Sequence, residues 1–120
     1  MAWGKIDSES IEKTDLKIPN KYKKYFLYVE ERFPEMGYGK QWVFRFPNNF
    51  GVSIIKHFGS FGYDKDLFEI AMLNFPSDIN DNAYLYYCDI TNDDVVGYLT
   101  NDEVIGYMER IKNYEETKDN

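Results

Sequence analysis

Hydrophobic and polar residues alternate most clearly in the middle of the chain. Over residues 41–47 the alternation places three aromatic side chains on one face, which is the pattern of a half-buried strand. The Asn48-Asn49 pair tolerates positive φ angles and predicts a hairpin turn into a second strand over 50–57. Further strands are predicted at 67–74 and 84–88. The pattern therefore predicts a four-stranded antiparallel meander.

Helical periods flank the predicted sheet on both sides. From Pro19 onward, hydrophobic residues recur every three or four positions as far as Phe33, which predicts an amphipathic helix over 21–33. A second hydrophobic stripe predicts a C-terminal helix that begins after Thr100 and ends near Tyr114. The predicted fold class is α+β: a four-stranded antiparallel meander sheet with an N-terminal helix and a C-terminal helix packed on it.

A short tandem repeat leads into the predicted C-terminal helix. The segment T-N-D-D-V-V-G-Y-L at 91–99 is followed directly by T-N-D-E-V-I-G-Y-M at 100–108. In each copy an acidic residue follows the first threonine at the spacing of a capping box, so both copies are predicted to begin as helices. The first would stop after one turn at Gly97, whereas the second would continue. The predicted capping pairs are Thr91 with Asp94 and Thr100 with Glu103.

The chain has the size and composition of one globular domain, with 120 residues of which 43% are hydrophobic. Residues 1–18 show no regular period and are expected to form a loose N-terminal arm. Residues 19–114 are expected to form the single α+β domain. Residues 115–120 are expected to be a polar tail.

The formal net charge of −7 opposes direct binding of nucleic acid, because contacts to phosphates depend on Lys and Arg. Basic or amphoteric protein partners are favoured instead. The single Cys88 cannot form an internal disulfide, and no signal-peptide pattern opens the chain, so a reducing cytoplasm is the expected compartment. No apolar run approaches the roughly 18 residues of a membrane span.

No catalytic or metal-binding signature stands out, so the chain is not predicted to be an enzyme and no cofactor is expected. His57 is the only histidine, and a simple meander does not place it beside Cys88. The acidic residues Asp89, Asp93 and Asp94 could coordinate a hard cation, but their spacing matches no EF-hand loop. Capping and the helix dipole explain acidic residues in a first helical turn, so no metal ligand is assigned.

The loop at 59–66 combines glycines, aromatic residues and carboxylates. Its aromatic side chains could either fold back as caps on the core or anchor a binding partner, and the sequence leaves both possibilities open. If the protein works by binding, negative charge and aromatic anchors coincide here, and the acidic turn near residue 93 could join them. The candidate binding residues are Phe61, Tyr63, Asp64, Asp66, Asp93 and Asp94.

Three segments together resemble a group of small bacteriophage proteins of unassigned function. They are F-P-N-N-F-G-V-S-I-I, F-G-Y-D-K-D-L-F-E-I-A-M-L and Y-Y-C-D-I-T-N-D-D-V-V-G-Y-L-T, and they extend over about residues 46–111. The resemblance implies a phage or prophage gene product that acts in the cytoplasm of a bacterial host. No catalytic residue comes with it.

The resemblance leads to the expectation of a small acidic binding protein that inhibits or modulates a host protein or defence complex. Mimicry of nucleic-acid charge is one way in which such a protein could act. An alternative is a module that captures a nucleotide or another small ligand between loop aromatics and backbone amides. A small hydrolase is the third possibility, for which no nucleophile, base and metal can be assembled.

Overall fold

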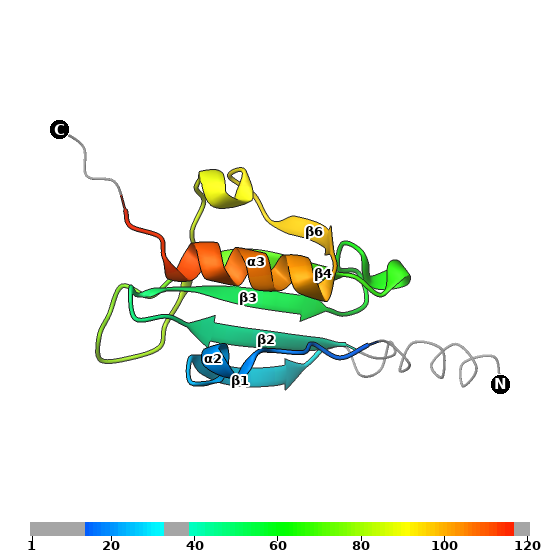
Figure 1. Cartoon of the computed structure of the whole chain (residues 1–120), viewed down its shortest axis with the longest axis horizontal. Coiled ribbons are helices and arrows are strands. Elements are labelled where there is room, and N and C mark those ends of the chain that lie inside the picture. The colour runs from blue at the N-terminus through cyan, green and yellow to red at the C-terminus, as the bar shows by residue number, and fades with distance from the viewer. Residues whose placement is uncertain (1–13, 33–38, 117–120) are drawn as a thin grey trace.

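An antiparallel sheet forms the centre of the protein in the computed structural model, which describes residues 14–32 and 39–116 (Figure 1). The elements in chain order are α2 (Asn20–Lys23), β1 (Phe26–Glu31), β2 (Lys40–Arg45), β3 (Phe50–Lys56), the 3-10 helix η2 (Tyr63–Lys65), β4 (Phe68–Asn74), β5 (Tyr84–Leu85), the 3-10 helix η3 (Asp89–Thr91), β6 (Val96–Leu99) and α3 (Asn101–Lys112). Within the described ranges the sheet has six strands in the order β1-β2-β3-β4-β5, and β6 also pairs with β4. The prediction of an α+β fold with an antiparallel sheet is confirmed, but the predicted count of four strands is too low.

The hairpin between β2 and β3 follows the sequence pattern closely. Phe44 lies opposite Val52, which in turn lies opposite Met72 of β4. Asn49 has a φ of 68°, and the side chain of Asn48 accepts a hydrogen bond from the backbone of Phe50 at 3.1 Å. Asn49 therefore adopts the left-handed backbone for which it was predicted, whereas Asn48 contributes through its side-chain hydrogen bond.

The predicted helix over 21–33 is wrong. The helix α2 ends at Lys23, and β1 then pairs with β2, with Val29 opposite Trp42. The stretch F-L-Y-V-E-E is rich in aromatic and β-branched residues, which fit a pleated surface, and the neighbouring strand satisfies its backbone. Because β1 is an edge strand with five exposed residues, it lacks the clean alternation that reveals a strand in sequence. Phe33, the last predicted helical residue, lies outside the described residues.

The two copies of the tandem repeat adopt different structures. In the second copy, the Glu103 amide donates to the Thr100 hydroxyl at 3.2 Å and the Thr100 amide donates to the Glu103 carboxylate at 2.8 Å. This confirms the predicted capping box at the start of α3. The first copy passes from η3 through a turn into β6, so its predicted helical turn is wrong. Its V-V-G-Y-L segment pairs with β4, where the β-branched residues are favoured.

The predicted pair of Thr91 and Asp94 makes no capping box. The Asp94 carboxylate accepts a hydrogen bond from the neighbouring Val95 amide at 2.7 Å. The Thr91 side chain is buried, and its hydroxyl has no hydrogen-bond partner in the described part of the chain. Thr91 and Thr100 occupy equivalent positions in the repeat, but only the Thr100 hydroxyl caps a helix.

This difference gives a matched pair of variants. Thr100→Val is expected to lower the free energy of unfolding by about 1 kcal/mol, because it removes an N-cap acceptor. Thr91→Val is expected to be neutral or stabilising, since it replaces an unsatisfied buried hydroxyl with a methyl group. Urea denaturation of the two variants measures both values. Equal losses in the two variants would contradict the assignment of the cap to Thr100.

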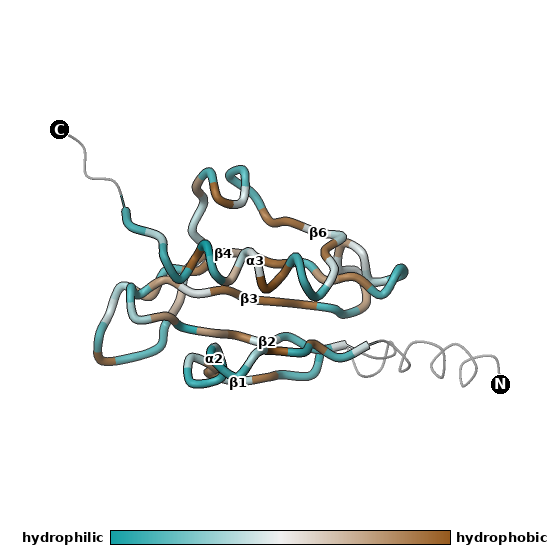
Figure 2. The backbone as a smooth tube through the Cα atoms, in the orientation of Figure 1, coloured by the Kyte–Doolittle hydropathy of each residue, from teal (hydrophilic) through white to brown (hydrophobic). Residues whose placement is uncertain are grey.

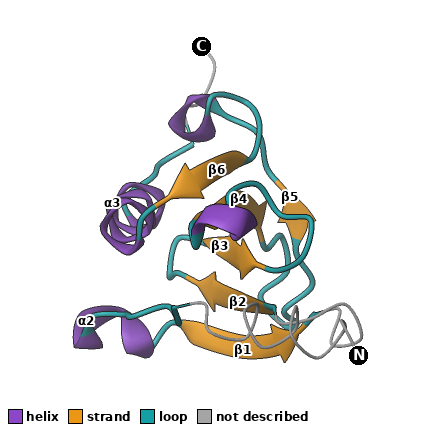
Figure 3. Cartoon of the chain, turned by 90° about the vertical axis from the view of Figure 1, so that its right-hand side faces the viewer, coloured by secondary structure: helices purple, strands orange, loops and turns teal. Residues whose placement is uncertain are grey.

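One face of the sheet packs against α3, and the core lies between them (Figure 3). The helix buries Val104, Met108 and Ile111. Figure 2 shows that much of β3, which lies beside this helix, consists of hydrophobic residues. The buried core of this face consists of Tyr22, Phe44, Phe46, Phe50, Val52, Ile54, Phe68, Ile70, Met72, Leu99, Val104, Met108 and Ile111.

The end of the predicted N-terminal arm lies against this core. Leu16 and Ile18 pack on it, and Lys17 exchanges two 2.8 Å hydrogen bonds with the side chain of Asn101 at the start of α3. The rest of the predicted arm, residues 1–13, and the tail beyond Glu116 lie outside the described residues. Across 14–32 and 39–116, no helix has both the length and the apolar character needed to cross a membrane.

Candidate functional site

The structure divides the four candidate residues of the loop between β3 and β4 into two kinds. Tyr63 is buried, with 8% of its surface exposed, so it caps the core. Phe61 is 56% exposed, and Asp64 is also exposed. The Asp66 side chain is 39% exposed, but its carboxylate is engaged in an ion pair with the buried Lys56. Of the four, Phe61 and Asp64 are therefore the exposed residues for which no such structural role is seen.

The ion pair of Lys56 and Asp66 joins three parts of the chain. The Lys56 side chain is 1% exposed, and its Nζ atom lies 2.7 Å from Asp66 Oδ1, 2.8 Å from the Thr14 carbonyl and 3.9 Å from the Phe68 ring centroid. The Thr14 amide also donates to Asp66 at 2.8 Å. Burial raises the pKa of Asp66, but the hydrogen bonds from Lys56 and Thr14 outweigh it and lower the pKa below its ordinary value. This side chain stabilises the fold.

Phe61 lies beside Tyr98 of β6. The Tyr98 amide donates to the Phe61 carbonyl at 3.2 Å, and the Phe61 amide donates to the Glu69 carboxylate at 2.8 Å. Phe61 packs over Gly97, where an added Cβ would overlap the Cβ of Phe61. The backbones of two aromatic residues, one from the loop and one from β6, are thus held together, and the Tyr98 side chain is 54% exposed.

The backbone of Tyr98 is in a conformation that its residue type disfavours. Its φ angle is 59°, in the left-handed region where a Cβ atom crowds the following carbonyl group. Such a conformation costs on the order of 1 kcal/mol or more for a bulky residue, and strain of this kind concentrates at functional sites. A half-exposed tyrosine at this position therefore contributes little to stability.

We define the aromatic surface as Phe58, Phe61, Asp64 and Tyr98, at the end of the sheet where the β3–β4 loop meets β6 (Figure 1). Phe58 is 49% exposed in the preceding turn of the same loop. Sequence reasoning found Phe61 and Asp64 but missed Tyr98. The signal available in the sequence was the Gly97-Tyr98 pair, which recurs as Gly106-Tyr107 and so appeared to be part of a helix repeat.

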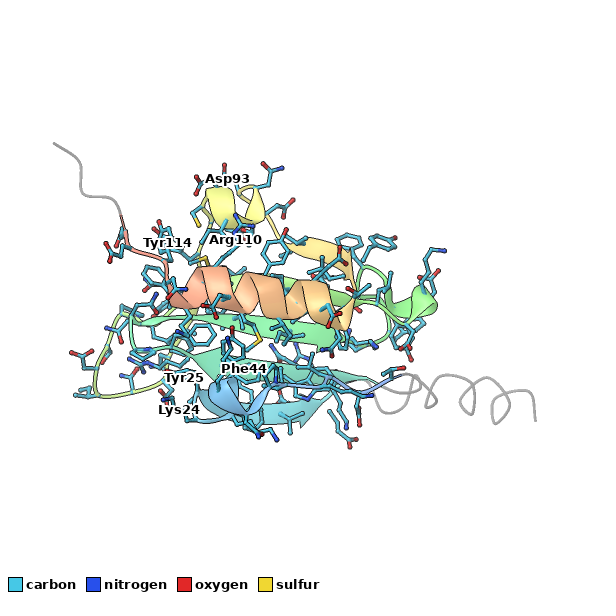
Figure 4. The ribbon with its side chains drawn as sticks, in the orientation of Figure 1. Lys24, Tyr25, Phe44, Asp93, Arg110 and Tyr114 are labelled. Atoms are coloured by element: carbon cyan, nitrogen blue, oxygen red, sulfur yellow. The ribbon has the colours of Figure 1, made fainter. Side chains whose placement is uncertain are left out.

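The acidic turn does not join this surface. Asp93 and Asp94 lie between η3 and the start of β6, whereas the loop meets Tyr98 toward the end of β6 (Figure 4). Asp93 itself has a φ of 60°, next to Asn92 at 57°. In the described ranges no group of three or more His, Cys, Asp and Glu side chains is placed to hold a metal ion.

His57 and Cys88 occupy different surroundings. The Cys88 Sγ atom lies 3.6 Å from Met72 Sδ, and the register partner of Met72 is Val52, near the opposite end of β3 from His57. The His57 Nδ1 atom lies 3.1 Å from the Phe58 carbonyl. The fold therefore does not assemble these two side chains into a nucleophilic pair.

A groove of about 390 Å³ opens on the face of the sheet away from α3. On its floor the Gln41 amide donates to the Ser53 hydroxyl at 2.8 Å. The loop after β4 forms one wall because Arg45 binds Asp81 and the carbonyl of Asn80 at 2.8 and 2.7 Å. Its lining residues are Tyr28, Gln41, Val43, Ser53, Leu73, Phe75, Asp81, Asn82, Ala83 and Leu85.

Comparisons with known proteins found no family model, no curated protein and no solved structure that matches this chain. The function is therefore argued from the geometry of the aromatic surface and the groove.

Proposed function

We propose that this protein binds another protein through the aromatic surface and thereby inhibits or modulates it. The observation that carries the proposal is the pair Phe61 and Tyr98, two half-exposed aromatic residues whose backbones are hydrogen-bonded to each other, one of them in a strained conformation. Exposed aromatic side chains on a rigid support are the usual anchors of protein interfaces, since they bury large area at small entropic cost. The resemblance to small phage proteins makes a host bacterial protein or defence complex the proposed partner, in the host cytoplasm.

Charge supports the choice of a basic or amphoteric partner surface. Asp64 is exposed three residues after Phe61 in the same loop, and the chain carries a net charge of −7. Opposite charges on the partner would speed the encounter, an effect that salt screens beyond about 10 Å at 0.1 M ionic strength. Asp64→Lys is therefore expected to act on the association rate more than on the dissociation rate.

The proposal predicts that substitutions in the aromatic surface weaken partner binding without lowering the melting temperature. Tyr98→Gly should leave the melting temperature within a few degrees of the wild-type value, because glycine relieves the strained φ angle while the exposed ring is lost. Combined with Phe61→Ala, it should weaken partner binding at least tenfold, or by about 1.4 kcal/mol. The measurement is capture of a partner from host lysate, followed by titration calorimetry with that purified partner.

The matched control is Tyr84→Ala, which removes a tyrosine that is 63% exposed on β5. This variant should bind the same partner with unchanged affinity. A partner that binds the Phe61 and Tyr98 variant as tightly as the wild-type protein would exclude the aromatic surface as its site.

The groove supports a second candidate function, the capture of a nucleotide or another small ligand. Its polar floor of Gln41 and Ser53 and the Tyr28 ring offer hydrogen bonds and a stacking surface. A thermal-shift screen with nucleotides, including cyclic ones, separates the two functions, since a ligand at 100 times its Kd stabilises the fold by about 2.7 kcal/mol. A shift that Tyr28→Ala abolishes and Phe61→Ala preserves would favour the groove.

A further inference from the structure

The edge strand β1 exposes an unusual amount of hydrophobic surface. Phe26, Tyr28 and Val29 are 41%, 47% and 48% exposed, although the strand lies in register with β2. In the described part of the chain β1 pairs with β2 alone, and it is the outermost strand of the sheet (Figure 3). An exposed hydrophobic edge of this kind is a template for pairing with another strand.

The length of β1 suits it to such pairing. It has six residues, which is the common length of a strand in a sheet, and one irregularity between Phe26 and Tyr28. The strand β5 has only two residues, so it offers too few peptide groups to extend the sheet. Among the described strands, β1 is therefore the edge that offers an added strand the most peptide groups for pairing.

Charged residues flank β1 in opposite order at its two ends. Lys23 and Lys24 precede the strand, and Glu30 and Glu31 end it, all four exposed. An antiparallel neighbour with the same sequence reverses this order, so that the lysines at the start of one copy of β1 lie near the glutamates at the end of the other copy. A parallel neighbour would place like charges together, which destabilises a strand pair.

The charge of the whole chain also distinguishes this edge. Two copies with a net charge of −7 repel each other over most approaches. Three of the lysines, Lys21, Lys23 and Lys24, gather on α2 and at its end beside β1, and Figure 4 shows Lys24 on this side of the molecule. Repulsion between two acidic copies is therefore weakest where the hydrophobic strand is exposed.

We propose that a second copy of this chain occupies the β1 edge, in an antiparallel β1–β1 pairing that continues the sheet across a two-fold axis. The pairing is isologous, so the same residues serve on both copies and the assembly closes as a dimer. It is independent of the proposed function, because the aromatic surface lies near β4 and β6, away from β1 in the strand order. The dimer presents that surface twice.

Charge reversal tests the proposal. Sedimentation of the wild-type full chain should show a dimer with twice the 14.3 kDa mass of the chain. This dimer should dissociate on dilution. Glu30→Lys with Glu31→Lys places lysines opposite lysines, and Lys23→Glu with Lys24→Glu places glutamates opposite glutamates, so each double variant should dimerise at least tenfold more weakly. An equimolar mixture of the two should form a heterodimer, because every end pair again has opposite charges.

The matched control for the glutamate variant is Glu115→Lys with Glu116→Lys, which makes the same change in net charge away from β1 and should retain the dimer. Hydrogen exchange measured at high and low concentration should show extra protection of β1 amides in the dimer. A wild-type chain that stays monomeric up to about 1 mM overturns the proposal. A control variant that loses the dimer, or a mixture of the two edge variants that stays monomeric, also overturns it.

Discussion

Replacing Asp66 with alanine is expected to lower the free energy of unfolding by about 2 to 3 kcal/mol, a substantial part of the stability of a domain of this size. The reason lies in its partner, Lys56, whose side chain is 1% exposed. The substitution removes the 2.7 Å charge-assisted hydrogen bond from the buried Lys56 ammonium and the hydrogen bond from the Thr14 amide. Urea denaturation measures the loss.

The pH dependence of stability provides an independent test of the same pair. The pKa of Asp66 is lower in the folded protein than in the unfolded chain, so its contribution is fully present above the unfolded pKa of about 3.9. The contribution is lost as the pH falls through the lower, folded pKa. The difference in unfolding free energy between the wild-type protein and Asp66→Asn should therefore be constant near neutral pH and shrink below about pH 4.

Two comparisons make this result specific. Glu109 also has a lowered pKa, chiefly because the Tyr22 hydroxyl donates a hydrogen bond to it, but its titration is common to both proteins and cancels in the difference. Asp64→Asn changes an exposed carboxylate in the same loop and should alter stability by less than about 0.5 kcal/mol. Equal stabilities of the Asp64 and Asp66 variants would show that the ion pair does not stabilise the fold.

Phe44→Ala is expected to lower the free energy of unfolding by about 3 to 5 kcal/mol, because it leaves a cavity in the main core. Phe44 is 1% exposed and lies on the face of β2 that packs toward α3. Its ring centroid lies 5.4 Å from that of Phe26 in an edge-to-face arrangement. Calorimetric or urea-induced unfolding measures the loss.

The matched control for this variant is Phe26→Ala, which removes the other ring of the same pair. Phe26 is 41% exposed on β1, so its loss should have a clearly smaller effect, of about 1 kcal/mol. Ile105→Ala should fall between the two, since Ile105 is only partly buried on α3. A larger loss for Phe26 than for Phe44 would contradict the placement of the core.

The features that the sequence predicted correctly are those encoded by neighbouring residues. The turn at Asn48-Asn49 depends on the left-handed backbone of Asn49 and on the side chain of Asn48, and the start of α3 depends on a threonine and a glutamate three positions apart. The aromatic alternation over 41–47 marks β2 because that strand has one face in the core. Each of these signals lies within a few residues of the structure that it specifies.

The remaining features depended on partners distant in the chain. Residues 26–31 suit a helix by period and a strand by composition, and pairing with β2 decided for the strand. Likewise, pairing with β4 made the first copy of the tandem repeat a strand, although its twin is a helix. Tertiary contacts also decided the roles of the loop residues, because Asp66 pairs with the buried Lys56, whereas Phe61 is hydrogen-bonded to β6 and stays exposed. Local sequence determines turns and caps, whereas strand pairing and the burial of charge depend on residues that meet only in the folded protein.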